Sequence, residues 1–136
     1  MTKFRRQKFK VETAKKLLKV AKDDLYAAEV LLTAPKARPE TVLYLVQQGI
    51  EKSLKAVLIH RQQSVPLTHD IDVLISELPE ILINNLPPGA GELTQYATIR
   101  RYIDGEELLE KSDLLEAHAV GVIFTTWANN EISKID

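Results

Sequence analysis

The stretch that decides the fold is Gln47-Gln48-Gly49-Ile50-Glu51-Lys52-Ser53-Leu54-Lys55-Ala56, followed after a proline-containing turn by Thr68-His69-Asp70. On a helix that turns by about 100° per residue, its polar side chains fall within one sector of about 140°. These polar residues are Gln47, Gln48, Glu51, Lys52 and Lys55. The other side is apolar or small, which predicts one face in the core and one dense polar face on a rigid helix.

Apolar residues at three- and four-residue steps predict five helices and no strand. The first two helices span about residues 11–32 and 40–63, and the third carries Ile71 to Leu78. A shorter helix follows at about 92–102, and the last runs from Ser112 to about Ile132. Thr68 or Asp70 is expected to cap the third helix, Ser112 the last, and Pro79 to kink or end the third. The predicted fold class is all-α.

The composition is that of one globular domain covering residues 1–136, with 45% hydrophobic and 27% charged residues. The chain has no cysteine and three scattered histidines, so we expect no disulfide, no metal site and no cofactor. It has no run of about 18 apolar residues that would cross a membrane. These features are typical of a cytoplasmic protein.

The net charge of −1 conceals a strong asymmetry. The first 22 residues carry nine Lys or Arg and one Glu, a net +8, while the remainder carries nine bases and eighteen acids, a net −9. One interpretation is that residues 1–10 form a basic arm for nucleic acid. The other is a solvated helix start that pairs with an acidic surface of the same or a neighbouring subunit.

Two packing features follow from the same patterns. Gly49 and Ser53 are four residues apart on the second helix, which should let a neighbouring helix approach closely. The last helix is apolar nearly all the way round, so it should be buried on several sides. Because a bundle of this size covers only some of those sides, a two-fold homodimer is one prediction. A fully central helix in a monomer is the alternative.

The polar face of the second helix suits phosphate binding. Lys52 and Lys55 are three residues apart and point the same way, with Gln48 as an adaptable hydrogen-bonding partner. The alternative is a surface lysine ladder in which Glu51 and Lys55 form an ordinary exposed pair. His69 lies beside a predicted helix start, where it can contact the opening amides or face a cleft toward the second helix.

A third cluster, Arg100-Arg101-Tyr102, combines two guanidiniums with a phenol, which suits contacts with phosphates and bases. The alternative is salt bridging to the acidic turn that follows, Asp104, Glu106 and Glu107. His118 is interpreted as a satisfied interior or interface group, and His60 as the end of the second helix, where a cation suits the free carbonyls.

Taken together, these residues resemble the HEPN domain. The resemblance rests on the Gln-Gln pair, Glu-Lys and Lys-Ala on one helix, Thr-His-Asp opening the next, and the arginine-tyrosine pair, and it extends from about Ala14 to Trp127. It implies an up-down bundle of four main helices plus a short extra helix, commonly dimeric and often encoded beside a nucleotidyltransferase.

Many HEPN domains look like ribonucleases that use an Arg and a His separated by four to six residues at the start of the last helix. Here Arg100 and Arg101 are followed by no histidine until His118, and seven residues separate Arg61 from His69. No catalytic residue is therefore assigned. The resemblance implies binding of a nucleotide or RNA through Gln48, Lys52, Lys55, His69, Arg100, Arg101 and Tyr102. The alternatives are a divergent ribonuclease toxin using His69, as in toxin-antitoxin pairs, and a protein-docking module.

Overall fold

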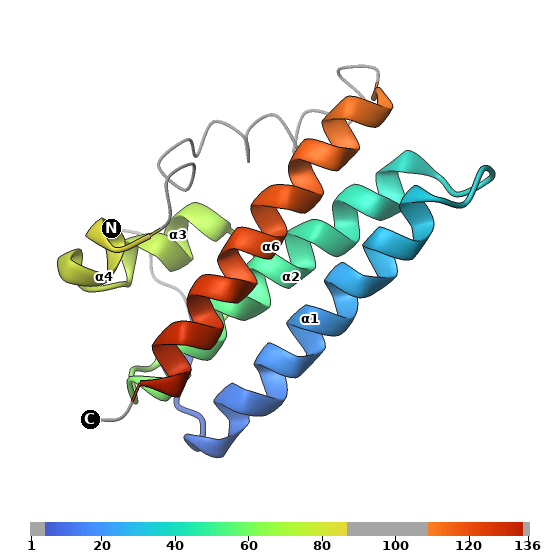
Figure 1. Cartoon of the computed structure of the whole chain (residues 1–136). Coiled ribbons are helices and arrows are strands. Elements are labelled where there is room, and N and C mark those ends of the chain that lie inside the picture. The colour runs from blue at the N-terminus through green and yellow to red at the C-terminus, as the bar shows by residue number, and fades with distance from the viewer. Residues whose placement is uncertain (1–4, 87–108, 135–136) are drawn as a thin grey trace.

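The computed structural model describes residues 5–86 and 109–134. Three long helices dominate it: α1 (Glu12–Leu32), α2 (Pro39–His60) and α6 (Lys111–Ser133). They lie side by side, with α1 and α2 joined by a short turn and α6 running in the same direction as α2 (Figure 1). The all-α fold class is confirmed. None of the helices within the described ranges is long and apolar enough to cross a membrane.

Helix α1 follows the predicted stripe. Its buried residues recur at three- and four-residue spacing and face the other helices: Ala14, Leu18, Ala21, Leu25 and Ala28. Pro39 begins α2, because its missing amide hydrogen costs nothing in a first turn. The helix ends at His60, earlier than the predicted residue 63, since Gln62 adopts a left-handed φ of 61° that an α-helix does not accept.

Helix α2 is the central element, in contact with α1, α6, α3 (Ile71–Ser76) and β2 (Val65–Pro66). Its residues Leu58 and Ile59 are also buried, although they project outside the predicted apolar face of the helix. Helix α6 buries the faces turned to α1 and α2 but leaves Leu115 and Val122 half exposed. The sequence predicted broad burial for α6, whereas the helix most fully enclosed is α2.

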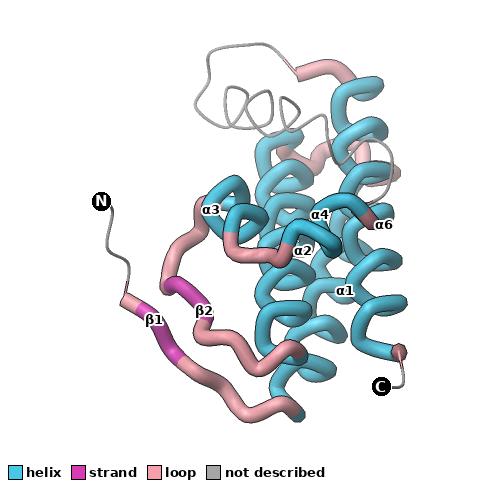
Figure 2. Tube along the Cα trace, turned by 90° about the vertical axis from the view of Figure 1, so that its left-hand side faces the viewer, coloured by secondary structure: helices cyan, strands magenta, loops and turns pink. Residues whose placement is uncertain are grey.

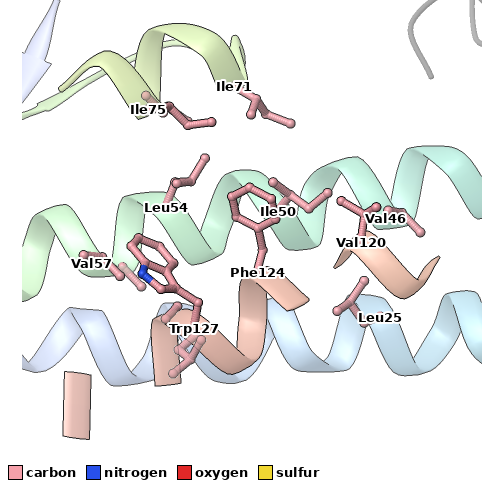
Figure 3. Close-up of a cluster of buried hydrophobic side chains, with 14 of the residues drawn as sticks. Leu25, Val46, Ile50, Leu54, Val57, Ile71, Ile75, Val120, Phe124 and Trp127 are labelled. Atoms are coloured by element: carbon pink, nitrogen blue, oxygen red, sulfur yellow. The ribbon is translucent and has the colours of Figure 1, made fainter. Parts of the chain in front are cut away.

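The predicted third helix is two short helices. Asp70 caps α3 by accepting hydrogen bonds from the amides of Asp72 and Val73, as expected. Pro79 ends the segment as predicted and starts α4 (Glu80–Asn84). Side chains of α3 face α2, where Ile71 and Ile75 lie near Leu54 (Figure 3). The helix predicted at 92–102 lies outside the described residues.

The prediction of no strand is wrong at one place. β1 (Arg6–Gln7) pairs antiparallel with β2, with Arg6 opposite Pro66 and Gln7 opposite Val65, beside α3 (Figure 2). Arg6 also forms an ion pair with Glu77, and that hydrogen bond raises the pKa of its guanidinium above the ordinary value. The described part of the basic arm is therefore attached to the connection between α2 and α3.

The last helix starts one residue before the predicted cap. Its N-cap is Glu110, not Ser112, because Glu110 and Asp113 form a reciprocal capping box in which the Asp113 carboxylate accepts from the Glu110 amide at 2.9 Å. Two side chains that each accept from one free amide are preferred over a single serine hydroxyl. Ser112 lies inside the first turn instead.

The three long helices meet around Leu25. A Cβ atom placed on Gly49 would lie 3.0 Å from Leu25, and one placed on Gly121 would lie 2.7 Å from it. Glycine thus permits the close approach predicted for Gly49. Phe124 and Trp127 of α6 point toward α2 in the same core (Figure 3), their rings edge to face with centroids 6.3 Å apart.

Candidate functional site

The centre of the site is Glu51, a carboxylate inside the protein. It is 3% exposed and receives two partners. The Lys55 ammonium lies 3.0 Å from its Oε2, and His69 Nδ1 lies 3.0 Å from Oε1 and 3.1 Å from Oε2. A buried carboxylate needs such partners because removal from water is costly for a charge. Glu51 therefore holds Lys55 and His69 together.

His69 is presented to solvent by this contact. The side chain is 83% exposed and stands on the loop between β2 and α3, next to the capping residue Asp70. Because an ionised carboxylate only accepts hydrogen bonds, Nδ1 is the nitrogen that carries the proton. In the neutral ring, Nε2 then keeps a free lone pair that points away from Glu51.

Lys52 has a different partner from Lys55. Its ammonium donates to Asp24 of α1 at 2.6 Å, and the two side chains are 23% and 19% exposed. The positive charge of the predicted patch is therefore compensated: Asp24 pairs with Lys52, and Glu51 pairs with Lys55. The Glu51–Lys55 pair of the alternative interpretation is present, but it is not an exposed pair, because Glu51 is buried.

The other predicted site residues have mixed outcomes. Gln48 is half-buried on α2, one turn before Lys52. Arg100, Arg101 and Tyr102 lie outside the described residues, so their approach to Lys55 stays a prediction. The structure brings Lys55 and His69 together from two elements and turns Lys52 toward α1.

The remaining histidines have structural environments. His118 is half-buried, and its Nε2 lies 3.2 Å from the Leu25 carbonyl oxygen of α1, as expected for a satisfied interior group. His60 is the last residue of α2. Within residues 5–86 and 109–134, no three His, Cys, Asp or Glu side chains are grouped to hold a metal ion.

This arrangement has two chemical abilities. Lys55 uses one of its three N–H donors on Glu51, and Lys52 uses one on Asp24. Their other donors make no hydrogen bond within the described residues and could bind an anion beside an exposed imidazole. The buried carboxylate also fixes the orientation and tautomer of His69, which is how carboxylates prepare histidines for proton transfer.

A family model described as the HEPN domain matches residues 14–130. The chain belongs to the HEPN domain family. The match begins within α1 and ends within α6, so it includes all the residues of the Glu51 cluster. No curated protein and no solved structure matches the chain. The resemblance found in the sequence is thereby confirmed.

The ribonuclease motif of many HEPN domains has no counterpart among the described residues. His118 is the histidine of the last helix, and its ring contacts the backbone of α1. Arg61 follows the end of α2, where its Nε donates to the Gln63 side chain at 3.1 Å. Of the described histidines, His69 is the one whose ring is held by a carboxylate.

Sequence reasoning missed the roles of Glu51 and Asp24. Glu51 was interpreted as one polar residue of an exposed face, and Asp24 was not singled out. The spacing of Glu51 and Lys55, four residues apart, did indicate a helix ion pair, but it carried no signal of burial. Nothing in the spacing indicated that the loop bearing His69 would cover this turn of α2.

Proposed function

We propose that this HEPN domain binds a phosphate-bearing ligand, a nucleotide or an RNA, at Lys55, His69 and Gln48. The observation that carries the proposal is the buried Glu51, which holds a lysine and an exposed histidine side by side. A phosphate is bound well by several N–H donors fixed on rigid backbone. Lys52 adds two further donors one turn away, close to its contact with Asp24.

The test is thermal unfolding of the purified protein with ATP, GTP and a labelled RNA as separate probes. We expect at least one probe to raise the melting temperature of the wild type, and we expect that rise to be lost in Lys55→Ala and His69→Ala. Lys36→Ala is the matched control, since Lys36 is exposed and distant in sequence from the cluster. Absence of any rise in the wild type, or an equal rise in the two site variants, would refute the proposal.

A second candidate function is cleavage of RNA with His69 as the proton-transferring group. The specific observation in its favour is the Glu51–His69 contact, which leaves Nε2 exposed. Cleavage of labelled RNA should then disappear in His69→Ala. It should fall in Glu51→Gln, because a neutral amide orients the imidazole less strongly than a carboxylate. Binding without cleavage supports the first proposal and excludes this one.

We also propose a homodimer and a nucleotidyltransferase partner, both implied by the family. The half-exposed Leu115 of α6 gives the homodimer an apolar contact. Light scattering of the pure protein measures its oligomeric state. If the protein is a dimer, the Leu115→Glu variant should shift it to a monomer. Co-purification with a nucleotidyltransferase tests the proposed partner. Binding to that protein, with no binding of nucleotide or RNA, would indicate a docking module.

A further inference from the structure

Three hollows follow one another along the outer seam between α1 and α6. The first, of about 310 Å³, shares Lys15 and Ile132 with the second, of about 300 Å³. The second shares Lys22 with the third, of about 240 Å³. Because neighbouring hollows share lining residues, they follow one another along one surface, which we call the α1–α6 groove, and the hydrogen bond from Lys22 to Asn129 crosses it next to the second hollow. It has no residue in common with the Glu51 cluster.

One wall of the groove is a row of lysines. Lys15, Lys19 and Lys22 line it at spacings of four and three residues, which places them on one ridge of α1. At a rise of about 1.5 Å per residue, Lys15 and Lys22 are separated by about 10 Å along the helix axis. All three are exposed, so an elongated ligand can reach them together.

The charge of this row is only partly compensated. Lys19 pairs with Asp23 at 3.0 Å. Lys22 donates to the neutral amide of Asn129 at 2.8 Å, and Lys15 has no carboxylate within ion-pair distance among the described residues. The acidic lining residues lie toward the two ends, Glu12 at one and Glu29 at the other. The middle of the groove is therefore positive.

The groove also offers an aromatic surface. Tyr26 lines its third hollow and is 67% exposed, on the same ridge as Lys19 and Lys22. A tyrosine that leaves most of its ring in water supplies a stacking platform for a base, as in proteins that bind single strands. Asn129 and Ser133 line the opposite wall and provide hydrogen-bonding groups.

We propose that the α1–α6 groove binds single-stranded nucleic acid, with phosphates on Lys15, Lys19 and Lys22 and a base stacked on Tyr26. A single strand fits because its bases are free to stack, whereas those of a duplex are already paired and stacked. The site is separate from the ligand site at Glu51, and it does not depend on the proposed function. Either site can exist without the other.

The experiment measures fluorescence anisotropy of labelled U20 and dT20 strands, and of a duplex of equal length, from 50 to 300 mM NaCl. Each phosphate contact to a single strand contributes about 0.7 to the slope of log K against log salt concentration. The triple variant Lys15→Ala, Lys19→Ala, Lys22→Ala should therefore lower the magnitude of that slope by about 2. Tyr26→Ala should weaken binding by about tenfold at fixed salt.

Two controls match these changes in charge and surface. The triple variant Lys16→Ala, Lys36→Ala, Lys111→Ala removes the same charge from exposed lysines that do not line the groove. Tyr44→Ala removes a tyrosine that is 56% exposed on α2. Both should retain the wild-type slope and affinity. His69→Ala should also retain them, which separates this site from the Glu51 cluster.

The proposal is supported if the groove variants lose binding to either single strand and the controls do not. It is overturned if the wild type binds neither single strand, or if the control triple variant lowers the slope as much as the groove triple variant. Equal binding of the duplex together with no effect of Tyr26→Ala also overturns it. Circular dichroism of each variant establishes that these surface changes leave the helices intact.

Discussion

Leu25 packs against two glycines. We therefore predict that the effect of one glycine substitution on stability changes sign when Leu25 is shortened. In Gly121→Ala, the new methyl group would lie 2.7 Å from Leu25 Cδ2 and 3.3 Å from Val46 Cγ1. Leu25 is 5% exposed and packed between helices, so it has little room to move away. Shortening Leu25 to alanine removes the atom that the methyl group would strike.

The magnitudes decide the expected signs. Overpacking of a core costs about 1–3 kcal/mol, while replacing glycine by alanine within a helix gains about 1 kcal/mol. Gly121→Ala alone should therefore lower the free energy of unfolding by about 0–2 kcal/mol. Leu25→Ala alone should lower it by about 2–5 kcal/mol. In the Leu25→Ala background, Gly121→Ala should instead raise it by about 1–2 kcal/mol, since the methyl group fills vacated space.

Urea denaturation followed by Trp127 fluorescence and circular dichroism measures all four proteins of this cycle. Gly49→Ala is an informative comparison, because its methyl group would meet the Ala21 carbonyl oxygen at 3.3 Å as well as Leu25. Backbone cannot retreat, so Leu25→Ala should rescue Gly49→Ala less than Gly121→Ala. If Gly121→Ala has the same effect with leucine and with alanine at position 25, the packing argument is refuted.

Three further predictions concern caps, ion pairs and the core. Asp70→Ala should cost about 1 kcal/mol of stability by removing the cap of α3, and Asp70→Asn, which keeps an acceptor, should recover most of it in urea denaturation. Asp24→Asn should lower the free energy of unfolding by about 1–2 kcal/mol, because it leaves the largely buried Lys52 without its carboxylate. The control Asp23→Asn, at an exposed position, should change it by less than about 0.5 kcal/mol. Equal effects of the two substitutions would contradict this. Phe124→Ala should cost about 3–5 kcal/mol, since its ring is fully buried, and a loss below about 1 kcal/mol in the same assay would contradict the packing described.

The fold was largely predictable because it depends on repeated signals. The stripe of α1 places an apolar residue on the same face at every turn, so no single substitution obscures it. The break at Pro79 is equally direct, since proline lacks an amide hydrogen. The strand pair was not predictable, because Arg6–Gln7 and Val65–Pro66 are too short for alternation and are defined by each other.

The candidate site was less predictable than the helices that carry it. A helical projection places Glu51 among polar neighbours, and nothing in it says which turn a distant loop will cover. The burial of Glu51 depends on tertiary packing, and so does the choice of Asp24 as the partner of Lys52. Spacing predicted that Lys52 and Lys55 share one face of the helix, and only the structure shows that Asp24 and Glu51 neutralise them.

The pairing of β1 with β2 has a consequence for the order of assembly. Arg6 and its partner Pro66 are sixty positions apart, so on the ribosome β1 emerges long before β2, the strand with which it pairs. Local contacts within the hairpin of α1 and α2 require much smaller loops to close and should form sooner. The short ribbon should therefore form after the α1–α2 hairpin and open before it under stress, exposing the segment next to His69 to proteases.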